Sequence, residues 1–167
     1  GRSSRHTEIT VGKEIERKFL VNQKLWKPLN GGTHFKQGYL NSQKERVVRV
    51  RIEGERAKLT IKGANNGISR SEFEYPLPVE DAAILLDTLC EQPLIDKHRH
   101  IETVGGKVWE IDVFHGDNEG LIVAEIELAS EDEGFELPAW ALADVSSDPR
   151  YYNSNLLKHP YRLWKAN

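Results

Sequence analysis

The sequence predicts an α+β fold, mainly β, in which eight antiparallel strands form a barrel with the helices packed outside. Three observations lead to this prediction. Apolar and polar residues alternate with a period of two in eight segments, turn signals separate most of these segments, and only one long segment has helical periodicity. Many consecutive strands with few helices favour a barrel or a closely related arrangement.

The eight candidate strands follow one another with short connections. Glycine lies in several of these connections, for example Gly54 between the third and fourth strands and Gly105 and Gly106 between the sixth and seventh. The strands are expected at residues 13–21, 34–40, 46–53, 56–62, 69–77, 94–102, 107–114 and 121–128.

The long helix is expected at residues 79–91, between Pro78 and Pro93. Its apolar residues recur at helical spacing: Ala82, Leu85, Leu86 and Leu89. Cys90 continues this apolar stripe, so we expect it in the core. A short helix is predicted at residues 23–29, and the tail after Glu136 is expected to be partly helical.

Composition excludes several classes of protein. The chain of 167 residues is long enough for one domain with a real core, and 23 Lys and Arg against 26 Asp and Glu give a net charge of -3. That balance argues against a dedicated nucleic-acid or membrane-surface binder. The single cysteine excludes an internal disulfide and favours the cytoplasm, and no apolar run approaches the roughly 20 residues that span a bilayer.

Charged residues occupy one face of almost every predicted strand. Acids occur in pairs two residues apart on the first, fifth, seventh and eighth strands, and bases occur in pairs on the third, fourth and sixth. The bases of this face are Lys18, Arg49, Arg51, Lys58, Lys62, Arg70, Lys97 and Arg99. The acids are Glu14, Glu16, Glu72, Glu74, Glu110, Asp112, Glu125 and Glu127.

Two interpretations fit this face. It could be the solvent face of an ordinary amphipathic sheet. It could instead be a concave wall that binds a metal–polyphosphate complex. Carboxylates two residues apart on one strand lie about 7 Å apart, and such pairs from two neighbouring strands can surround a hard divalent cation, while Arg binds phosphate through two nitrogens. The scarcity of uncharged polar residues and the separation of acids from bases by strand favour the second interpretation.

The residues of this face resemble a known family. Glu14-Ile15-Glu16-Arg17-Lys18 is similar to the ExExK signature of the CYTH family, the triphosphate tunnel metalloenzymes, and the similarity runs from about residue 13 to residue 157. The other segments that carry it, in the family's order, are Gln37-Gly38-Tyr39-Leu40, Arg49-Val50-Arg51, Leu59-Thr60-Ile61-Lys62, Arg70-Ser71-Glu72-Phe73-Glu74, Lys97-His98-Arg99, Trp109-Glu110-Ile111-Asp112-Val113-Phe114, Glu125-Ile126-Glu127 and Asp148-Pro149-Arg150-Tyr151-Tyr152.

The resemblance implies an eight-stranded β-tunnel with a charged lumen, formed by a single domain at residues 9–167 that follows a disordered arm or cloning remnant at residues 1–8. It implies a divalent-metal-dependent triphosphatase that cleaves the terminal phosphate of a triphosphate, with inorganic tripolyphosphate as the expected substrate. Family members also hydrolyse thiamine triphosphate or cyclise ATP. A thiamine triphosphatase, a class IV-like adenylate cyclase and a non-catalytic polyphosphate- or nucleotide-binding module are therefore the alternatives.

The resemblance also implies roles for individual residues. The expected ligands of Mg²⁺ or Mn²⁺ are Glu14, Glu16, Asp112, Glu125 and Glu127. The expected phosphate-binding residues are Lys18, Arg49, Arg51, Lys62, Lys97 and Arg99. Lys97 and Tyr39 match a catalytic dyad, and Glu72 and Glu74 match acids that would position water or support the metal ligands.

Some residues have two interpretations. Tyr39 could face the lumen or lie in the core. His98 and His100 form an HxH pattern typical of transition-metal sites, but they alternate with Lys97 and Arg99, so we expect them on the opposite face as packing or surface residues. The tail tryptophans are expected to pack on the barrel, although a C-terminal helix could close one tunnel mouth. The only partner expected is the small triphosphate, bound by a monomer or homodimer without nucleic acid or membrane.

Overall fold

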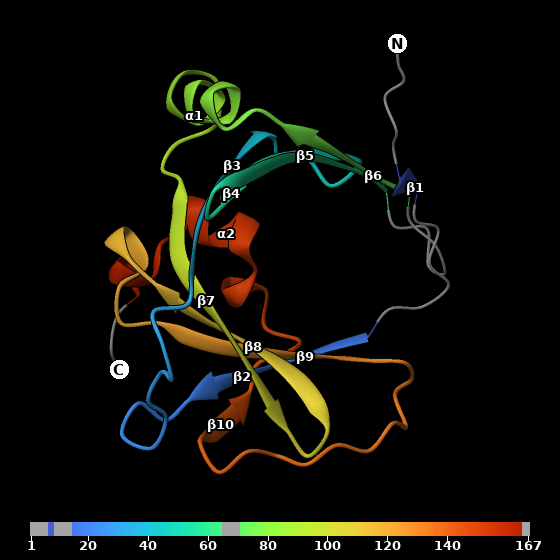
Figure 1. Ribbon diagram of the computed structural model, residues 1–167, viewed down its shortest axis with the longest axis vertical. Coiled ribbons are helices and arrows are strands. Elements are labelled where there is room, and N and C mark those ends of the chain that lie inside the picture. Colours follow the sequence, from blue (N-terminus) through green and yellow to red (C-terminus); the bar gives the residue numbers. More distant parts are fainter. Residues whose placement is uncertain (1–6, 9–14, 65–70, 165–167) are drawn as a thin grey trace. The chain divides into compact units, whose positions relative to one another are not determined.

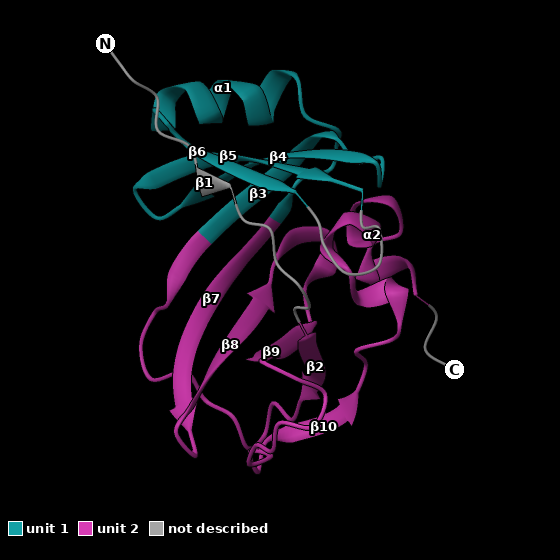
Figure 2. Ribbon diagram, turned by 90° about the vertical axis from the view of Figure 1, so that its right-hand side faces the viewer, with its two compact units in different colours: residues 1–13, 35–95 teal, residues 14–34, 96–167 magenta. Residues whose placement is uncertain are grey.

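A computed structural model gives the fold, and it describes residues 7–8, 15–64 and 71–164 (Figure 1). The described elements are mainly strands, with two α-helices and three short 3₁₀ helices, and the strand pairings described here are all antiparallel. The predicted class, α+β and mainly β, is therefore confirmed. The chain divides into two compact units, residues 1–13 with 35–95 and residues 14–34 with 96–167 (Figure 2).

Unit 1 is a sheet covered by one helix. Its strand order is β1-β6-β5-β4-β3, and the helix α1 spans Val79–Thr88. The strands are β1 (Thr7–Glu8), β6 (Glu72–Leu77), β5 (Arg56–Gly63), β4 (Arg46–Glu53) and β3 (Thr33–Asn41), whose first two residues belong to unit 2. Gly54, with φ 63°, makes the tight turn between β4 and β5, because glycine adopts this left-handed conformation without strain.

Unit 2 is a second sheet followed by the C-terminal tail. Its strand order is β7-β8-β9-β2-β10, with strands β7 (Ile95–Val104), β8 (Lys107–Phe114), β9 (Ile122–Leu128), β2 (Ile15–Val21) and β10 (Ala141–Asp144). The 3₁₀ helix η1 (Gly116–Asn118) links β8 to β9, and the tail contains η2 (Pro149–Tyr151), α2 (Asn153–Lys158) and η3 (Tyr161–Leu163). The partly helical tail is thereby confirmed.

Each unit has its own apolar core on one face of its strands. In unit 2 the indole of Trp109 is fully buried, with ring centroids 5.7 Å from Phe19, 5.9 Å from Phe135 and 5.6 Å from Trp140. Trp140 therefore packs the segment after β9 on the strands, as predicted. Trp164 makes its described ring contacts within the tail itself.

The core of unit 1 lies between its strands and α1. Val50 and Ala57 meet Ala82, Leu86 and Cys90 there. This placement confirms Cys90 as a core residue, and burial, with a smaller contribution from Glu91, raises the pKa of its thiol to about 11. A thiol with a pKa this high is protonated near neutral pH and is a poor nucleophile.

Three predictions of local structure were wrong or incomplete. Residues 23–25 form a turn and residues 26–29 are irregular, so the predicted helix is absent. Pro28 lacks an N–H and disfavours the helical conformation at the residue before it. Helix α1 ends at Thr88, three residues early, because the N–H of Cys90 turns back to the carbonyl of Leu85. The short strands β1 and β10 were not predicted, because two and four residues are too few to show alternation.

The strands of the predicted barrel are all present, although the starts of the first and fifth, at residues 13–14 and 69–70, lie outside the described residues. In each unit the strand order is linear, and no described pairing within a unit closes it into a ring. None of the helices in the described ranges is long and apolar enough to cross a membrane.

Gly38 on β3 tests the packing of α1. A Cβ at Gly38 would lie 3.2 Å from Leu86 Cδ2 of α1, and 3.0 Å from Cys90 Cβ and 2.6 Å from Leu94 Cδ2 in the segment that follows. We therefore expect Gly38→Ala to lower the free energy of unfolding by about 1–3 kcal/mol. Urea unfolding measures the change. Gly31→Ala is the control, since nothing lies within 4 Å of its added Cβ, and equal stabilities of the two variants would contradict this packing.

Candidate active site

The strand register of unit 2 gathers its predicted site residues on one face. Glu16 on β2 lies opposite Glu127 on β9, and Lys18 lies opposite Glu125, which in turn lies opposite Glu110 on β8. Residues directly opposite one another in an antiparallel pair point to the same side of the sheet. The charged face predicted from alternation is therefore real in unit 2, and it is the face opposite the Trp109 core.

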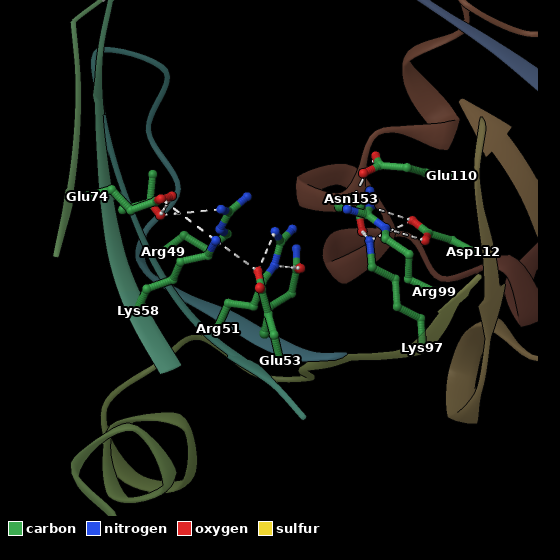
Figure 3. Close-up of polar contacts among 12 residues, drawn as sticks. Arg49, Arg51, Glu53, Lys58, Glu74, Lys97, Arg99, Glu110, Asp112 and Asn153 are labelled. Atoms are coloured by element: carbon green, nitrogen blue, oxygen red, sulfur yellow. Dashed lines mark hydrogen bonds and ion pairs between the residues drawn. The ribbon is translucent and has the colours of Figure 1, made fainter. Parts of the chain in front are cut away.

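Asp112 on β8 binds two bases of β7 at once. Its carboxylate forms an ion pair with Lys97, whose Nζ lies 2.8 Å from Oδ2 (Figure 3). It also accepts two hydrogen bonds from Arg99, one from Nε at 2.8 Å and one from Nη2 at 2.9 Å. Lys97 is 0% exposed and Asp112 is 5% exposed, while Arg99 also approaches Glu110 at 3.4 Å. Buried charges need such partners, so this group is a fixed part of the face.

The electrostatics of this group follow from its contacts. Burial by itself raises the pKa of Asp112, but the charges and hydrogen bonds of Lys97 and Arg99 more than offset burial and hold that pKa well below the ordinary range. Burial likewise opposes the charge of Arg99, and Asp112 raises the pKa of the guanidinium far above its usual value. Asp112 and Arg99 are therefore both charged at neutral pH.

The C-terminal tail reaches the same bases. The side chain of Lys97 donates to Asn153 Oδ1 at 3.0 Å (Figure 3). Lys18 Nζ donates to the carbonyl oxygen of Tyr151 at 3.4 Å, pairs with Glu125 at 3.3 Å and lies 5.3 Å from the ring centre of Tyr152. Sequence analysis assigned no role to these three tail residues, because they are far from both lysines in the sequence and follow no strand pattern.

The candidate metal ligands fall into two groups. Glu16 and Glu127 are exposed carboxylates in register with each other, and Glu125 lies on the same face, so these oxygens are chemically suited to Mg²⁺ or Mn²⁺. Asp112 fits a metal poorly, since Lys97 and Arg99 already bind both of its oxygens. Glu14 lies outside the described residues. Within the described ranges no three His, Cys, Asp or Glu side chains are arranged to hold a metal ion.

Unit 1 presents a second charged face, on β3 to β6. Thr60 links two of its predicted residues, because its hydroxyl donates to Glu74 Oε2 at 3.1 Å and accepts from Arg49 Nη2 at 3.3 Å. Lys58 Nζ lies 3.7 Å from Glu74 and 3.2 Å from Glu53. The predicted acid Glu74 is thus held in a network of bases and a hydroxyl.

Arg51 and Lys62 have their own partners on this face. Arg51 donates from Nε to Gln37 Oε1 at 2.7 Å and from Nη1 to Glu53 at 3.3 Å. Lys62 lies 3.7 Å from Glu72, the other predicted acid. Burial raises the pKa of Glu53, but Lys58 and Arg51 outweigh it and lower that pKa overall.

The register also places Tyr39. It lies opposite Arg49 in the β3–β4 pair and is 6% exposed, so it is on the charged face of unit 1 although it is buried. Tyr39 belongs to unit 1 and Lys97 to unit 2. Their action as a dyad therefore stays a prediction.

The HxH histidines lie on the other face of β7, as predicted. His98 is opposite Val113 and His100 is opposite Ile111, both on the apolar side of β8. The Nδ1 atom of His98 is 2.7 Å from His115 Nε2, and its ring stacks on His34 with centroids 4.9 Å apart. His100 packs edge-on against Trp26. His98 thus makes a hydrogen bond and ring contacts on this face, and no metal-holding group of three His, Cys, Asp or Glu occurs among the described residues.

The sheet of unit 2 is thus antiparallel and gathers buried bases and paired carboxylates on one face. The family model described as "CYTH domain" matches residues 12–159 of this chain. The chain therefore belongs to the CYTH family. The match extends over residues of both compact units.

Individual relatives are similar over nearly the whole chain. An inorganic triphosphatase of Acetivibrio thermocellus is 47% identical over 155 residues, which are 93% of this chain and 99% of the relative. An inorganic triphosphatase of Nitrosomonas europaea is 33% identical over 150 residues, 86% of this chain and 95% of that protein. A crystal structure of an inorganic triphosphatase superimposes with a TM-score of 0.68 at 30% identity, covering 87% of this chain and 94% of that one.

Asp112→Asn tests the buried ion group. The amide would leave Lys97 and Arg99 charged and underpartnered, so we expect the free energy of unfolding to fall by about 3–5 kcal/mol. Chemical denaturation measures it. The control is Asp144→Asn. This change weakens the partly exposed ion pair with Arg17, whose Nε lies 2.9 Å from Asp144 Oδ2, and we expect it to lower the free energy of unfolding by less than about 1 kcal/mol. Equal losses would show that Asp112 is not the centre of a buried group.

The histidine cluster predicts a dependence of stability on pH. Burial, and then the neighbouring His115 and His34, lower the pKa of His98 below its ordinary 6.5. The unfolded chain therefore binds more protons than the folded chain below about pH 6.5, and the free energy of unfolding falls as pH falls through this range. We expect a smaller loss between pH 7 and pH 5 in His98→Phe, measured by urea unfolding. An unchanged slope would contradict this, and the exposed His159→Phe is the control.

Proposed function

We propose that this chain is a divalent-metal-dependent inorganic triphosphatase that hydrolyses tripolyphosphate to pyrophosphate and phosphate. The observation that carries the proposal is the 47% identity to an inorganic triphosphatase across 99% of that relative. The charged faces support it, because they offer bases for a polyphosphate and carboxylates for a hard cation.

In the proposed mechanism the bases bind the phosphates. Lys97 and Arg99 stabilise the charge that spreads over the phosphoryl oxygens in a loose transition state, together with Lys18, Arg49, Arg51 and Lys62. Asp112 is better suited to hold Lys97 and Arg99 in place than to bind metal, since both its oxygens face these two bases. We therefore revise its expected role from metal ligand to positioning residue.

The carboxylates that would hold Mg²⁺ or Mn²⁺ are Glu16, Glu127 and Glu125, with Glu14 added by the resemblance. The bound ion would neutralise part of the charge of the triphosphate. Exposed carboxylates on neighbouring strands support this assignment, because they can approach an ion that arrives with the substrate.

The chemical step transfers the terminal phosphoryl group to water. The water oxygen bonds to the terminal phosphorus, the bond from that phosphorus to the bridging oxygen breaks, and pyrophosphate leaves. In the proposal Glu72 or Glu74 orients the water, and Lys97 with Tyr39 assists proton movement or the leaving group. Cleavage in the cytoplasm fits a chain whose single cysteine is a buried free thiol.

The test measures phosphate release from tripolyphosphate, ATP and thiamine triphosphate, each with Mg²⁺, Mn²⁺ or EDTA. We expect metal-dependent release, fastest from tripolyphosphate. Release chiefly from thiamine triphosphate, or cyclic AMP formed from ATP, would replace the proposed activity with one of the alternatives. Binding of tripolyphosphate without any product would indicate a binding module.

The carboxylate assignment is tested by Glu16→Ala and Glu127→Ala. We expect each to reduce metal-dependent phosphate release by about 100-fold or more, the scale of losing a charged group that acts in the transition state, while the circular dichroism spectrum stays that of the wild type. Glu55→Ala, in the exposed turn after β4, is the control and should keep the wild-type rate. Full activity in both site variants would refute the metal assignment.

A further inference from the structure

Gln37 is a buried polar residue on the charged face of unit 1 to which no role has been assigned. It lies on β3, opposite Arg51 and two residues from Tyr39, and its side chain is 1% exposed. A fully buried glutamine on a strand between charged residues must satisfy an amide oxygen and two N–H groups.

The contact with Arg51 fixes the orientation of this amide. The guanidinium of Arg51 can only donate hydrogen bonds, so the group 2.7 Å from its Nε must be the Gln37 oxygen, Oε1. The nitrogen, Nε2, therefore points away from Arg51. Among the described residues it has no hydrogen-bond partner.

A second buried donor on the same face has the same property. The Nε of Arg49, on the strand next to β3, also has no partner within the part of the chain that the structure describes. Buried donors without acceptors are rare in folded proteins and call for an explanation such as a bound ion. An acceptor for either donor would lie near the bases Arg49, Arg51 and Lys58. Two acids, Glu53 and Glu74, pair with this group, so its positive charges outnumber the negative ones and favour an anion.

We propose that the side-chain amide of Gln37 is a substrate-binding group that donates a hydrogen bond from Nε2 to a phosphoryl oxygen of the triphosphate. The inference rests on the proposed function, which supplies the anion. Phosphoryl oxygens only accept at neutral pH, so they match a donor such as Nε2. The oxygen of the same amide holds Arg51, so one side chain both binds the anion and orients a base beside it.

A neutral amide has a physical advantage at this position. A further Lys or Arg would add like-charge repulsion to Arg49, Arg51 and Lys58 whenever the anion is absent. An acid would pair with Arg51 but would repel phosphate. Glutamine supplies an acceptor on one side and donors on the other without adding charge, which is what this position between a base and an anion requires.

A direct test follows the Gln37 amide by nuclear magnetic resonance. The ¹H–¹⁵N signals of Nε2 are identified by their loss in Gln37→Met, and tripolyphosphate is added to the wild type with EDTA and, separately, with Mg²⁺. We expect these side-chain protons to move downfield as tripolyphosphate saturates the protein. Shifts of the Arg49 and Arg51 signals without a shift of the Gln37 amide would overturn the proposal, as would the absence of any shift.

Two variants separate the donor from the contact with Arg51. Gln37→Glu keeps an oxygen for Arg51 but loses the donor and adds a charge, and Gln37→Met loses both hydrogen bonds at similar volume. We expect both to weaken tripolyphosphate binding by about 10-fold or more in calorimetry, while Gln37→Glu without ligand melts at or above the wild-type temperature. Wild-type affinity in Gln37→Met would show that only charge matters and would overturn the proposal.

The same samples are assayed for phosphate release. A wild type that binds tripolyphosphate through Gln37 but releases no phosphate would refute the proposed activity and keep the binding role. A wild type that hydrolyses tripolyphosphate with an unmoved Gln37 amide would keep the activity and refute the binding role. The two failures are therefore distinguishable.

Discussion

The interaction on which the charged face of unit 2 depends is the carboxylate of Asp112 between Lys97 and Arg99. Lys97 is completely buried, and a buried ammonium is stable only beside a negative charge. Since the carboxylate binds both bases from one position, it also fixes the distance between them. The same residue therefore stabilises the fold and sets the spacing of two groups that would bind phosphate.

Alternation in the sequence predicted most of this arrangement. A period of two assigns each strand residue to a face, so Glu16, Glu127 and Arg99 were correctly separated from Trp109 and His98. What alternation cannot give is the partner of each charge, because a partner depends on register and on side-chain length. The resemblance implied a metal-binding role for Asp112, and the register places it opposite Arg99.

Sequence analysis missed one charged residue of these faces, Glu53, and several uncharged ones. Thr60, Gln37 and Asn153 hold Glu74, Arg51 and Lys97 through single hydrogen bonds at 3.1, 2.7 and 3.0 Å. Amides and hydroxyls in a strand or loop look like ordinary polar positions in a sequence. Their importance appears only when the charge that each one contacts is known, and Asn153 is 56 residues from its lysine.

The contacts of the tail have a consequence for how the protein is made. Tyr151 and Asn153 contact Lys18 and Lys97, yet a ribosome adds them after every strand that carries a predicted acid or base. A nascent chain that ends after β9 already carries every predicted acid and base but leaves these two lysines without their tail partners. During synthesis the strands therefore lack these two contacts until the tail has followed them out of the ribosome.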